Sequence, residues 1–223
     1  MPKNMIRKRN FLSFFRTNDM NKINIFEPKG NVNRAVLGLH GYTGNEQSLT
    51  PIALGSRCRN TRWYLPAAPF DLPDREGKSW FQKKSSGEWD ISSAFSVIRA
   101  TLDRIQADGI SLRKTALLGF SQGACLALEY GLRFPTHFGG LIPVAGFIKY
   151  PEQLGKQLSG EETTIPILII HGEKDTIVPP EKGREVMSFL ADRGIPARIH
   201  WHHDGHKIPV KALREIKSFV EGL

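Results

Sequence analysis

Ser121 stands between two glycines in the run Gly119-Phe120-Ser121-Gln122-Gly123, where an apolar segment gives way to a helical one. A G-x-S-x-G pattern between a strand and a helix is typical of a nucleophilic serine held on a sharp turn. Small residues two positions to either side would let the strand and the helix approach each other. A serine hydroxyl is a weak nucleophile until a base takes its proton, so the pattern predicts a histidine nearby in the fold.

We predict that His206 is this base and that Asp175 is the acid that orients it. His206 follows a glycine in a loop after the last predicted strand, and Asp175 follows an apolar run. The carboxylate would accept a hydrogen bond from the imidazole and stabilise its charged form. His203 is the nearest alternative for the base, and Glu173 is the nearest alternative for the acid. The chain order serine, aspartate, histidine differs from the orders of two well-known protease groups.

The other five histidines are given structural interpretations. His200 and His202 alternate along the last predicted strand, which suggests surface or packing positions. His40 is interpreted as a hydrogen-bonding residue of its own loop. His137 and His171 are expected in loops without a motif for a base.

A glycine-rich turn after the first apolar run, His40-Gly41-Tyr42-Thr43-Gly44, supplies a second element of the expected site. We predict that the backbone N–H of Tyr42 and the backbone N–H of Gln122 point at one spot beside the serine. Two such donors would form an oxyanion hole, in which each donor lowers the barrier by about 3–4 kcal/mol.

The elements that must position these residues alternate between strand-like and helix-like patterns. Strands are expected over 35–39, 63–65, 115–119, 141–144, 165–170 and 198–201, and helices over 92–109, 122–134, 181–193 and 210–220. Ser92 or Ser93 should cap the first of these helices and Gly109 should end it; Pro143 makes its strand the least certain. The alternation predicts an α/β fold with a doubly wound, mostly parallel sheet and helices on both faces. Ligands then lie beyond the carboxyl ends of the strands.

The chain from about Ala35 to Leu223 resembles the phospholipase/carboxylesterase family of α/β-hydrolases, which includes small carboxylesterases and acyl-protein thioesterases. The resemblance rests on LHG at 39–41, APFDLPDREGKSWF at 68–81, GFSQG at 119–123, HGEKDTIVP at 171–179 and GH at 205–206. It implies an α/β-hydrolase fold without a large lid, and hydrolysis of carboxylic esters or thioesters without metal or cofactor. It also implies that Trp80 and Phe81 lie near an acyl pocket and contact the substrate.

One departure bears on the substrate. Thioesterases of this family usually carry a G-D-T-G-type run after the first H-G, whereas this chain has Tyr42-Thr43-Gly44-Asn45. The expectation is therefore a serine carboxylesterase that acts on small-molecule esters, with lysophospholipids among the candidates. An acyl-protein or other thioesterase is the alternative. A non-catalytic binding protein on a hydrolase fold is a further one, although such a protein would be expected to lose a residue of the triad.

Composition limits the partners that we expect. The formal net charge is +9, but residues 1–20 carry five basic side chains against Asp19, and the remaining bases are scattered, so nucleic-acid binding is not predicted. We predict a disordered basic N-terminal extension over 1–20 and a hydrolase domain over 21–223, with Met20 as an alternative start. The Phe and Leu residues beside the basic ones suit weak association of this extension with a membrane surface. No apolar run is long enough for stable membrane insertion. Two cysteines fit a reducing cytoplasm, and the chain is expected to be a monomer or homodimer.

Overall fold

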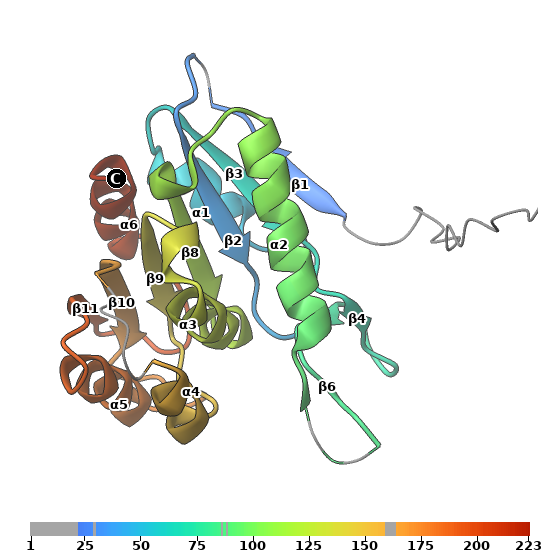
Figure 1. Cartoon of the computed structure of the whole chain (residues 1–223), viewed down its shortest axis with the longest axis vertical. Coiled ribbons are helices and arrows are strands. Elements are labelled where there is room, and N and C mark those ends of the chain that lie inside the picture. Colours follow the sequence, from blue (N-terminus) through green and yellow to red (C-terminus); the bar gives the residue numbers. More distant parts are fainter. Residues whose placement is uncertain (1–21, 29, 86, 88, 159–163) are drawn as a thin grey trace, which may run out of the picture.

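The computed structural model describes residues 22–28, 30–85, 87, 89–158 and 164–223, and Figure 1 shows their arrangement. The predicted extension over residues 1–20 lies outside the described residues. Among the helices that are described, none combines the length and the apolar character that crossing a membrane requires.

A seven-stranded sheet forms the centre of the fold, with the spatial order β1-β3-β2-β8-β9-β10-β11. Its strands are β1 (Ile23–Phe26), β2 (Arg34–Leu39), β3 (Thr61–Pro66), β8 (Thr115–Phe120), β9 (Gly140–Val144), β10 (Ile167–Gly172) and β11 (Ala197–His202). Strand β1 runs antiparallel to β3, and all the other pairs are parallel. The doubly wound, mostly parallel sheet predicted from the sequence is thus confirmed.

Helices cover both faces of the sheet. They are α1 (Thr50–Ser56), α2 (Ser92–Ala107), α3 (Gln122–Arg133), α4 (Pro151–Gln157), α5 (Pro180–Ala191) and α6 (Ala212–Glu221), with short 3-10 turns at Leu112–Lys114 and Pro135–His137. The buried side chains of α2, α3 and α5 belong to one hydrophobic cluster, and those of α1 and α6 belong to a second.

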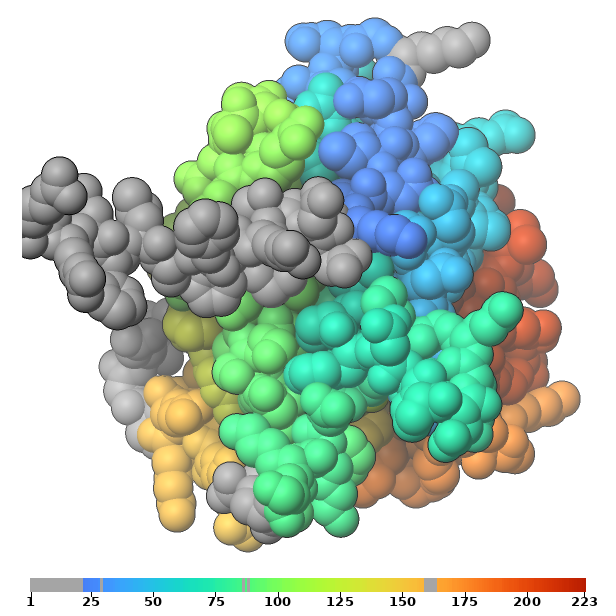
Figure 2. All heavy atoms as spheres, turned by 90° about the vertical axis from the view of Figure 1, so that its right-hand side faces the viewer, coloured from blue at the N-terminus to red at the C-terminus, as the bar shows by residue number. Residues whose placement is uncertain are grey.

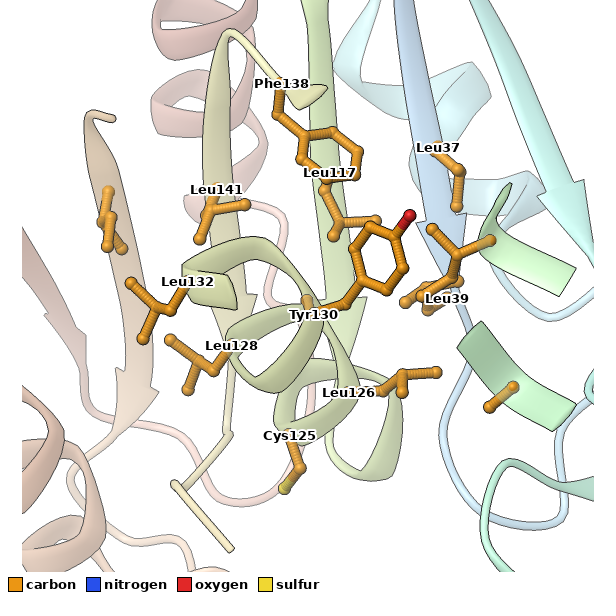
Figure 3. Close-up of a cluster of buried hydrophobic side chains, with 14 of the residues drawn as sticks. Leu37, Leu39, Leu117, Cys125, Leu126, Leu128, Tyr130, Leu132, Phe138 and Leu141 are labelled. Carbon is orange, nitrogen blue, oxygen red and sulfur yellow. The ribbon is translucent and has the colours of Figure 1, made fainter. Parts of the chain in front are cut away.

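The two clusters explain why the central strands read as continuous apolar runs. In β8, Leu117 belongs to the cluster under α3, whereas Ala116 and Leu118 belong to the cluster under α1 and α6. Side chains alternate between the faces of a strand, so a strand covered on both faces needs apolar residues at every position. Figure 3 shows the first cluster, with Tyr130 and Leu126 of α3 beside Leu117 and Leu39 of the sheet.

Several boundaries differ from the sequence predictions. Strand β10 begins at Ile167 and includes His171 and Gly172, two residues later than predicted at each end. Neither predicted serine caps α2; the Asp90 carboxylate accepts from the Ser92 N–H at 2.9 Å instead. The predicted end holds, since Gly109 adopts a φ of 81° just after the helix.

Pro143 lies inside β9, an interior strand of the sheet, opposite Gly119 of β8. Proline lacks the N–H that a ladder uses and is usually found at sheet edges. Helices α1 and α4, strand β1 and two small hairpins, β4–β5 (Phe70–Asp71 with Lys78–Ser79) and β6–β7 (Gln82–Lys83 with Trp89–Asp90), were not predicted.

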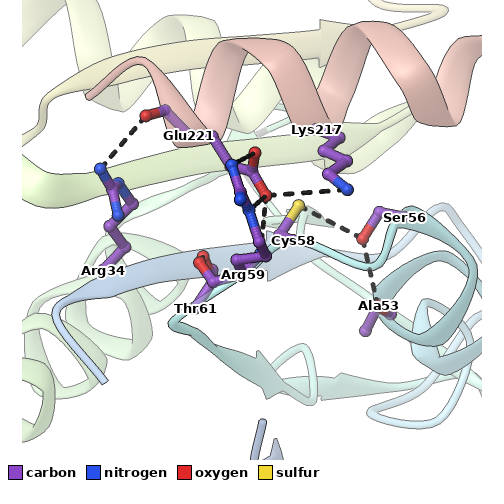
Figure 4. Close-up of polar contacts among 8 residues, drawn as sticks. All are labelled: Arg34, Ala53, Ser56, Cys58, Arg59, Thr61, Lys217 and Glu221. Atoms are coloured by element: carbon purple, nitrogen blue, oxygen red, sulfur yellow. Dashed lines mark hydrogen bonds and ion pairs between the residues drawn. The ribbon is translucent and has the colours of Figure 1, made fainter. Parts of the chain in front are cut away.

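A polar cluster fixes the end of α6 against the start of the central strands, as Figure 4 shows. The Glu221 carboxylate accepts from the Arg59 backbone N–H at 2.8 Å and from the Arg59 guanidinium, and the Arg34 guanidinium donates to the Glu221 carbonyl at 3.2 Å. Arg34 and Arg59 lie at the amino ends of β2 and β3, so this cluster marks the edge of the sheet opposite the predicted site.

Candidate active site

Ser121 occupies the turn between β8 and α3 with φ 53° and ψ −115°. A positive φ in a non-glycine residue is strained and persists only where the surroundings enforce it. The Ser121 N–H donates to the Val144 carbonyl of the neighbouring strand at 2.9 Å, and the Ser121 carbonyl accepts from the N–H groups of Ala124 and Cys125. The backbone is therefore held on both sides of the serine.

The two flanking glycines are required by close backbone contacts. A Cβ at Gly119 would lie 2.1 Å from the Gly123 carbonyl oxygen, and a Cβ at Gly123 would lie 2.3 Å from the Leu39 carbonyl oxygen. Both distances are far below van der Waals contact. The strand and the helix thus approach each other as closely as the sequence pattern predicted.

The structure brings Ser121, His206 and Asp175 together. His206 Nε2 lies 2.9 Å from Ser121 Oγ, and His206 Nδ1 lies 2.7 Å from Asp175 Oδ2. These three residues come from the loops after β8, β11 and β10, which meet at the carboxyl edge of the sheet. The Phe120 ring packs 4.9 Å from the imidazole, centroid to centroid. With the carboxylate on Nδ1, the imidazole presents Nε2 to the hydroxyl as an acceptor.

Asp175 is buried, and its carboxylate accepts several hydrogen bonds. Its Oδ1 accepts from the N–H groups of Ile177 at 2.9 Å and Val178 at 2.8 Å. Burial alone would raise the pKa of Asp175, but the hydrogen bonds from His206, Val178 and Ile177 outweigh it and hold that pKa below its ordinary value. The carboxylate is therefore charged at neutral pH.

The two alternatives from the sequence pair with each other. His203 Nδ1 contacts Glu173 Oε2, and the two side chains are 88% and 42% exposed. They extend from the same loops as His206 and Asp175, yet Ser121 contacts His206 and not His203. The geometry thus favours His206 and Asp175 over His203 and Glu173.

Two histidines near the site have structural contacts that the sequence only partly indicated. His171 was predicted in a loop, but it is wholly buried at the end of β10, where its Nε2 lies 2.9 Å from the Val178 carbonyl oxygen. It therefore braces the loop that carries Asp175. His40 accepts from the Ala68 N–H at Nε2, 3.1 Å away, and donates from Nδ1 to the Gly41 carbonyl at 2.7 Å, in line with its predicted structural role. Burial lowers the pKa of His40.

The loop after β2 lies against the serine. A Cβ on Gly41 would be 3.5 Å from Ser121 Cβ, and the loop is tied to the β4–β5 hairpin because the Thr43 N–H donates to the Lys78 carbonyl at 3.1 Å. In the part of the chain that the structure describes, no hydrogen bond engages the backbone N–H of Tyr42 or of Gln122. Their role as an oxyanion hole stays a prediction.

Trp80 and Phe81 are buried beside this loop. The Trp80 indole N–H donates to the His40 carbonyl at 2.8 Å, and the Trp80 backbone N–H donates to the Gln122 side-chain oxygen at 2.9 Å. The Gln122 amide nitrogen in turn donates to Ser79 Oγ. These contacts explain how Trp80 fixes the two loops around Ser121, a function that the sequence did not indicate. Contact of Trp80 or Phe81 with substrate stays a prediction.

The described residues hold no group of three or more His, Cys, Asp or Glu side chains arranged to bind a metal ion. Both cysteines, Cys58 and Cys125, are buried and unpaired.

Comparison with known proteins identifies relatives of this chain in both sequence and structure. The Arabidopsis thaliana carboxylesterase SOBER1 is 28% identical over 202 residues, which cover 83% of this chain and 89% of the relative. Acyl-protein thioesterase 1 of Kluyveromyces lactis is 30% identical over 143 residues, which cover 59% of this chain and 63% of the relative. The crystal structure of esterase PE8 superimposes with a TM-score of 0.79 at 28% identity, covering 91% of this chain and 99% of that one. The fold is the α/β-hydrolase fold. Residues 20–223 match the phospholipase/carboxylesterase family, and the chain belongs to it.

Proposed function

We propose that this protein hydrolyses carboxylic esters through Ser121, His206 and Asp175 by way of an acyl-enzyme. The observation that carries the proposal is the unbroken contact from Ser121 Oγ to His206 Nε2 and from His206 Nδ1 to Asp175 Oδ2. The relatives named as carboxylesterases support the same class of reaction.

In the first half of the reaction, His206 Nε2 takes the Ser121 proton while Ser121 Oγ attacks the ester carbonyl carbon. The resulting tetrahedral oxyanion accepts hydrogen bonds from the N–H groups of Tyr42 and Gln122. The carbonyl re-forms, and the alcohol leaves with the proton held on His206. In the second half, His206 deprotonates a water that attacks the acyl-enzyme, and the acid leaves as Ser121 regains its proton.

Asp175 orients the imidazole and stabilises its protonated form. Its lowered pKa keeps it charged throughout the cycle, and its two backbone donors fix the carboxylate in place. Ser121 directly precedes α3, and its strained backbone presents the hydroxyl at the amino end of this helix. There the first N–H groups of the helix and the positive end of its dipole favour a developing negative charge.

Carboxylic esters are the favoured substrates, with lysophospholipid esters included, and a thioesterase is the second candidate. The absence of the G-D-T-G-type run at Tyr42–Asn45 favours the ester, while the acyl-protein thioesterases among the relatives keep the alternative open. We further propose a cytoplasmic location, because both cysteines are unpaired, and a monomer or homodimer in solution.

The test is hydrolysis of p-nitrophenyl acetate by the wild type and by Ser121→Ala. We expect turnover to fall by about 10⁴-fold or more while the circular dichroism spectrum is unchanged. A fluorophosphonate should label the wild type and leave the variant unlabelled. Full activity of Ser121→Ala would refute the assignment, and an unlabelled, inactive wild type would favour a non-catalytic binding protein.

A second series separates ester from thioester. p-Nitrophenyl esters of rising chain length are compared with a palmitoyl thioester by kcat/KM, because one methylene changes discrimination by only about 1–3 kcal/mol. The ester proposal predicts the larger kcat/KM for an ester of some chain length; a larger value for the thioester would identify the alternative.

A further inference from the structure

Lys149 is enclosed by aromatic rings at the same edge of the sheet as Ser121. Its ammonium nitrogen lies 4.2 Å from the centroid of the Trp89 ring, 5.3 Å from that of Phe81 and 5.7 Å from that of Tyr150. Burial lowers the pKa of Lys149 against the opposing effect of nearby Cys125 and Glu129. Lys149 is only partly buried, so a ligand can reach its ammonium group.

This cation has no acidic partner of its own. No ion pair joins Lys149 to a carboxylate among the residues that the structure describes. Glu129 acts on the pKa of Lys149, but the Glu129 carboxylate is already paired with Arg133 and accepts from the Tyr150 backbone N–H. A partly desolvated ammonium without a counter-charge is suited to bind an anion.

The surroundings add further positive charge. In the β6–β7 hairpin Lys83 pairs directly with Trp89, so the two side chains emerge on the same face of the ribbon. Trp89 is 41% exposed although it is a large aromatic residue. Figure 2 shows the green atoms around this hairpin at the lower end of the molecule, beside the yellow-orange segment that contains α4.

The cluster is connected to the nucleophile by two short paths. Phe81 directly follows Trp80, whose backbone N–H is bonded to the side chain of Gln122, the residue after Ser121. On the other side, the loop that carries Lys149 leaves β9 at Val144, whose carbonyl accepts from the Ser121 N–H, and crosses the first turn of α3, where a Cβ on Gly146 would lie 2.7 Å from that of Ala124. Cys125 follows Ser121 by about one turn of this helix, and it is the first of the two nearby groups that oppose the fall in the pKa of Lys149. The Lys149 ammonium and Ser121 therefore lie beside the same turn of α3.

We propose that Lys149, supported by Trp89, Phe81 and Lys83, binds an anionic group that the ester carries away from the scissile bond. The inference rests on the proposed ester hydrolysis and narrows its substrate class to esters with a remote carboxylate or phosphate. Aromatic rings hold the ammonium in place, while the ion pair with substrate replaces the water that it loses.

The test compares two substrates of equal chain length, p-nitrophenyl hexanoate and the mono-p-nitrophenyl ester of adipic acid, which adds a terminal carboxylate. A second pair, 1-hexanoylglycerol and its 3-phosphate, places the anion on the alcohol side. We expect the wild type to prefer the anionic member of one pair by about tenfold in kcat/KM. The preferred pair identifies whether the carboxylate or the phosphate is recognised. This preference should fall as salt is raised, because the site is partly exposed.

Lys149→Met should lower that preference about tenfold, and Lys149→Arg should retain most of it. Lys156→Met is the matched control, since it removes the same charge from an exposed position of α4, and it should leave the preference unchanged. Equal losses on the neutral and anionic esters in Lys149→Met would indicate a purely structural lysine and overturn the inference. So would a wild type that prefers neither anionic ester. After either of these outcomes, the proposed function would still hold if the wild type hydrolyses p-nitrophenyl hexanoate and Ser121→Ala does not.

Discussion

Two acid–histidine pairs connect the loops after β10 and β11, and they differ in burial and in contact with Ser121. Glu173 and His203 meet in solvent, where the histidine side chain is 88% exposed. Asp175 and His206 meet a few residues further along, where the aspartate side chain is wholly buried and the histidine is 18% exposed. Only the inner pair contacts Ser121. We propose that its burial and its contact with Ser121 suit the inner pair to catalysis.

The backbone explains the difference. The Glu173 N–H donates to the His202 carbonyl, and a Cβ on Gly172 would lie 2.4 Å from the Asp204 carbonyl oxygen, so the two loops are packed directly against each other. From this contact the outer side chains point to water. The inner carboxylate is enclosed by the N–H groups of Ile177 and Val178.

The largest expected effect is on the two histidines. His206→Ala should lower kcat for p-nitrophenyl acetate by about 10⁴-fold or more, because Ser121 loses its base. His203→Ala should retain the wild-type rate. Initial rates at saturating substrate measure both. Comparable losses in the two variants would mean that the geometry does not separate the pairs.

The next largest difference in kcat is expected between variants of the two acids, Asp175 and Glu173. Asp175→Asn should lower kcat by about 10³- to 10⁴-fold, because an amide on Nδ1 favours the wrong tautomer of His206. Glu173→Gln serves as the exposed control, and we expect its kcat to match the wild type. The same assay applies, and an active Asp175→Asn would show that the inner carboxylate is dispensable.

Acid should weaken the inner pair. The pKa of Asp175 is lowered in the fold, so its contribution to stability is complete above the ordinary carboxylate pKa, near 4, and is lost as the pH falls through the lowered value. Urea unfolding of wild type and Asp175→Asn should show a gap in unfolding free energy at pH 7 that shrinks below about pH 4. Glu173→Gln should show no measurable gap at either pH. A gap for Asp175→Asn that is the same at pH 7 and pH 3 would contradict the pKa shift.

Much of the site was accessible from sequence because its residues follow strands. Ser121, Asp175 and His206 each lie in a loop after a predicted strand, and a parallel sheet brings such loops to one edge. The bracing contacts were not accessible. Polar His171 looked like a loop residue, yet a hydrogen bond to the Val178 carbonyl lets it end a buried strand. Trp80 was predicted as a substrate contact, and its further role, in which the indole N–H donates to the His40 carbonyl, depends on residues that only the folded chain brings near.

The fold was predicted where periodicity was strong and missed where it was weak. Strand β1 and the hairpins are short, and the seven-residue helices α1 and α4 span too few turns for a clear pattern. The start of α2 at Ser92 agrees with the prediction, but its cap was missed, because Asp90, two residues earlier, accepts from the first N–H of the helix.

The backbone of Ser121 has a consequence for how this protein can evolve. Its φ of 53° costs about 1–3 kcal/mol in any residue with a side chain. Glycine alone would relax this turn, and glycine has no nucleophile. At this position, the residue that would relax the backbone cannot act as the nucleophile. A descendant protein that no longer needs turnover would therefore gain stability by replacing Ser121 with glycine.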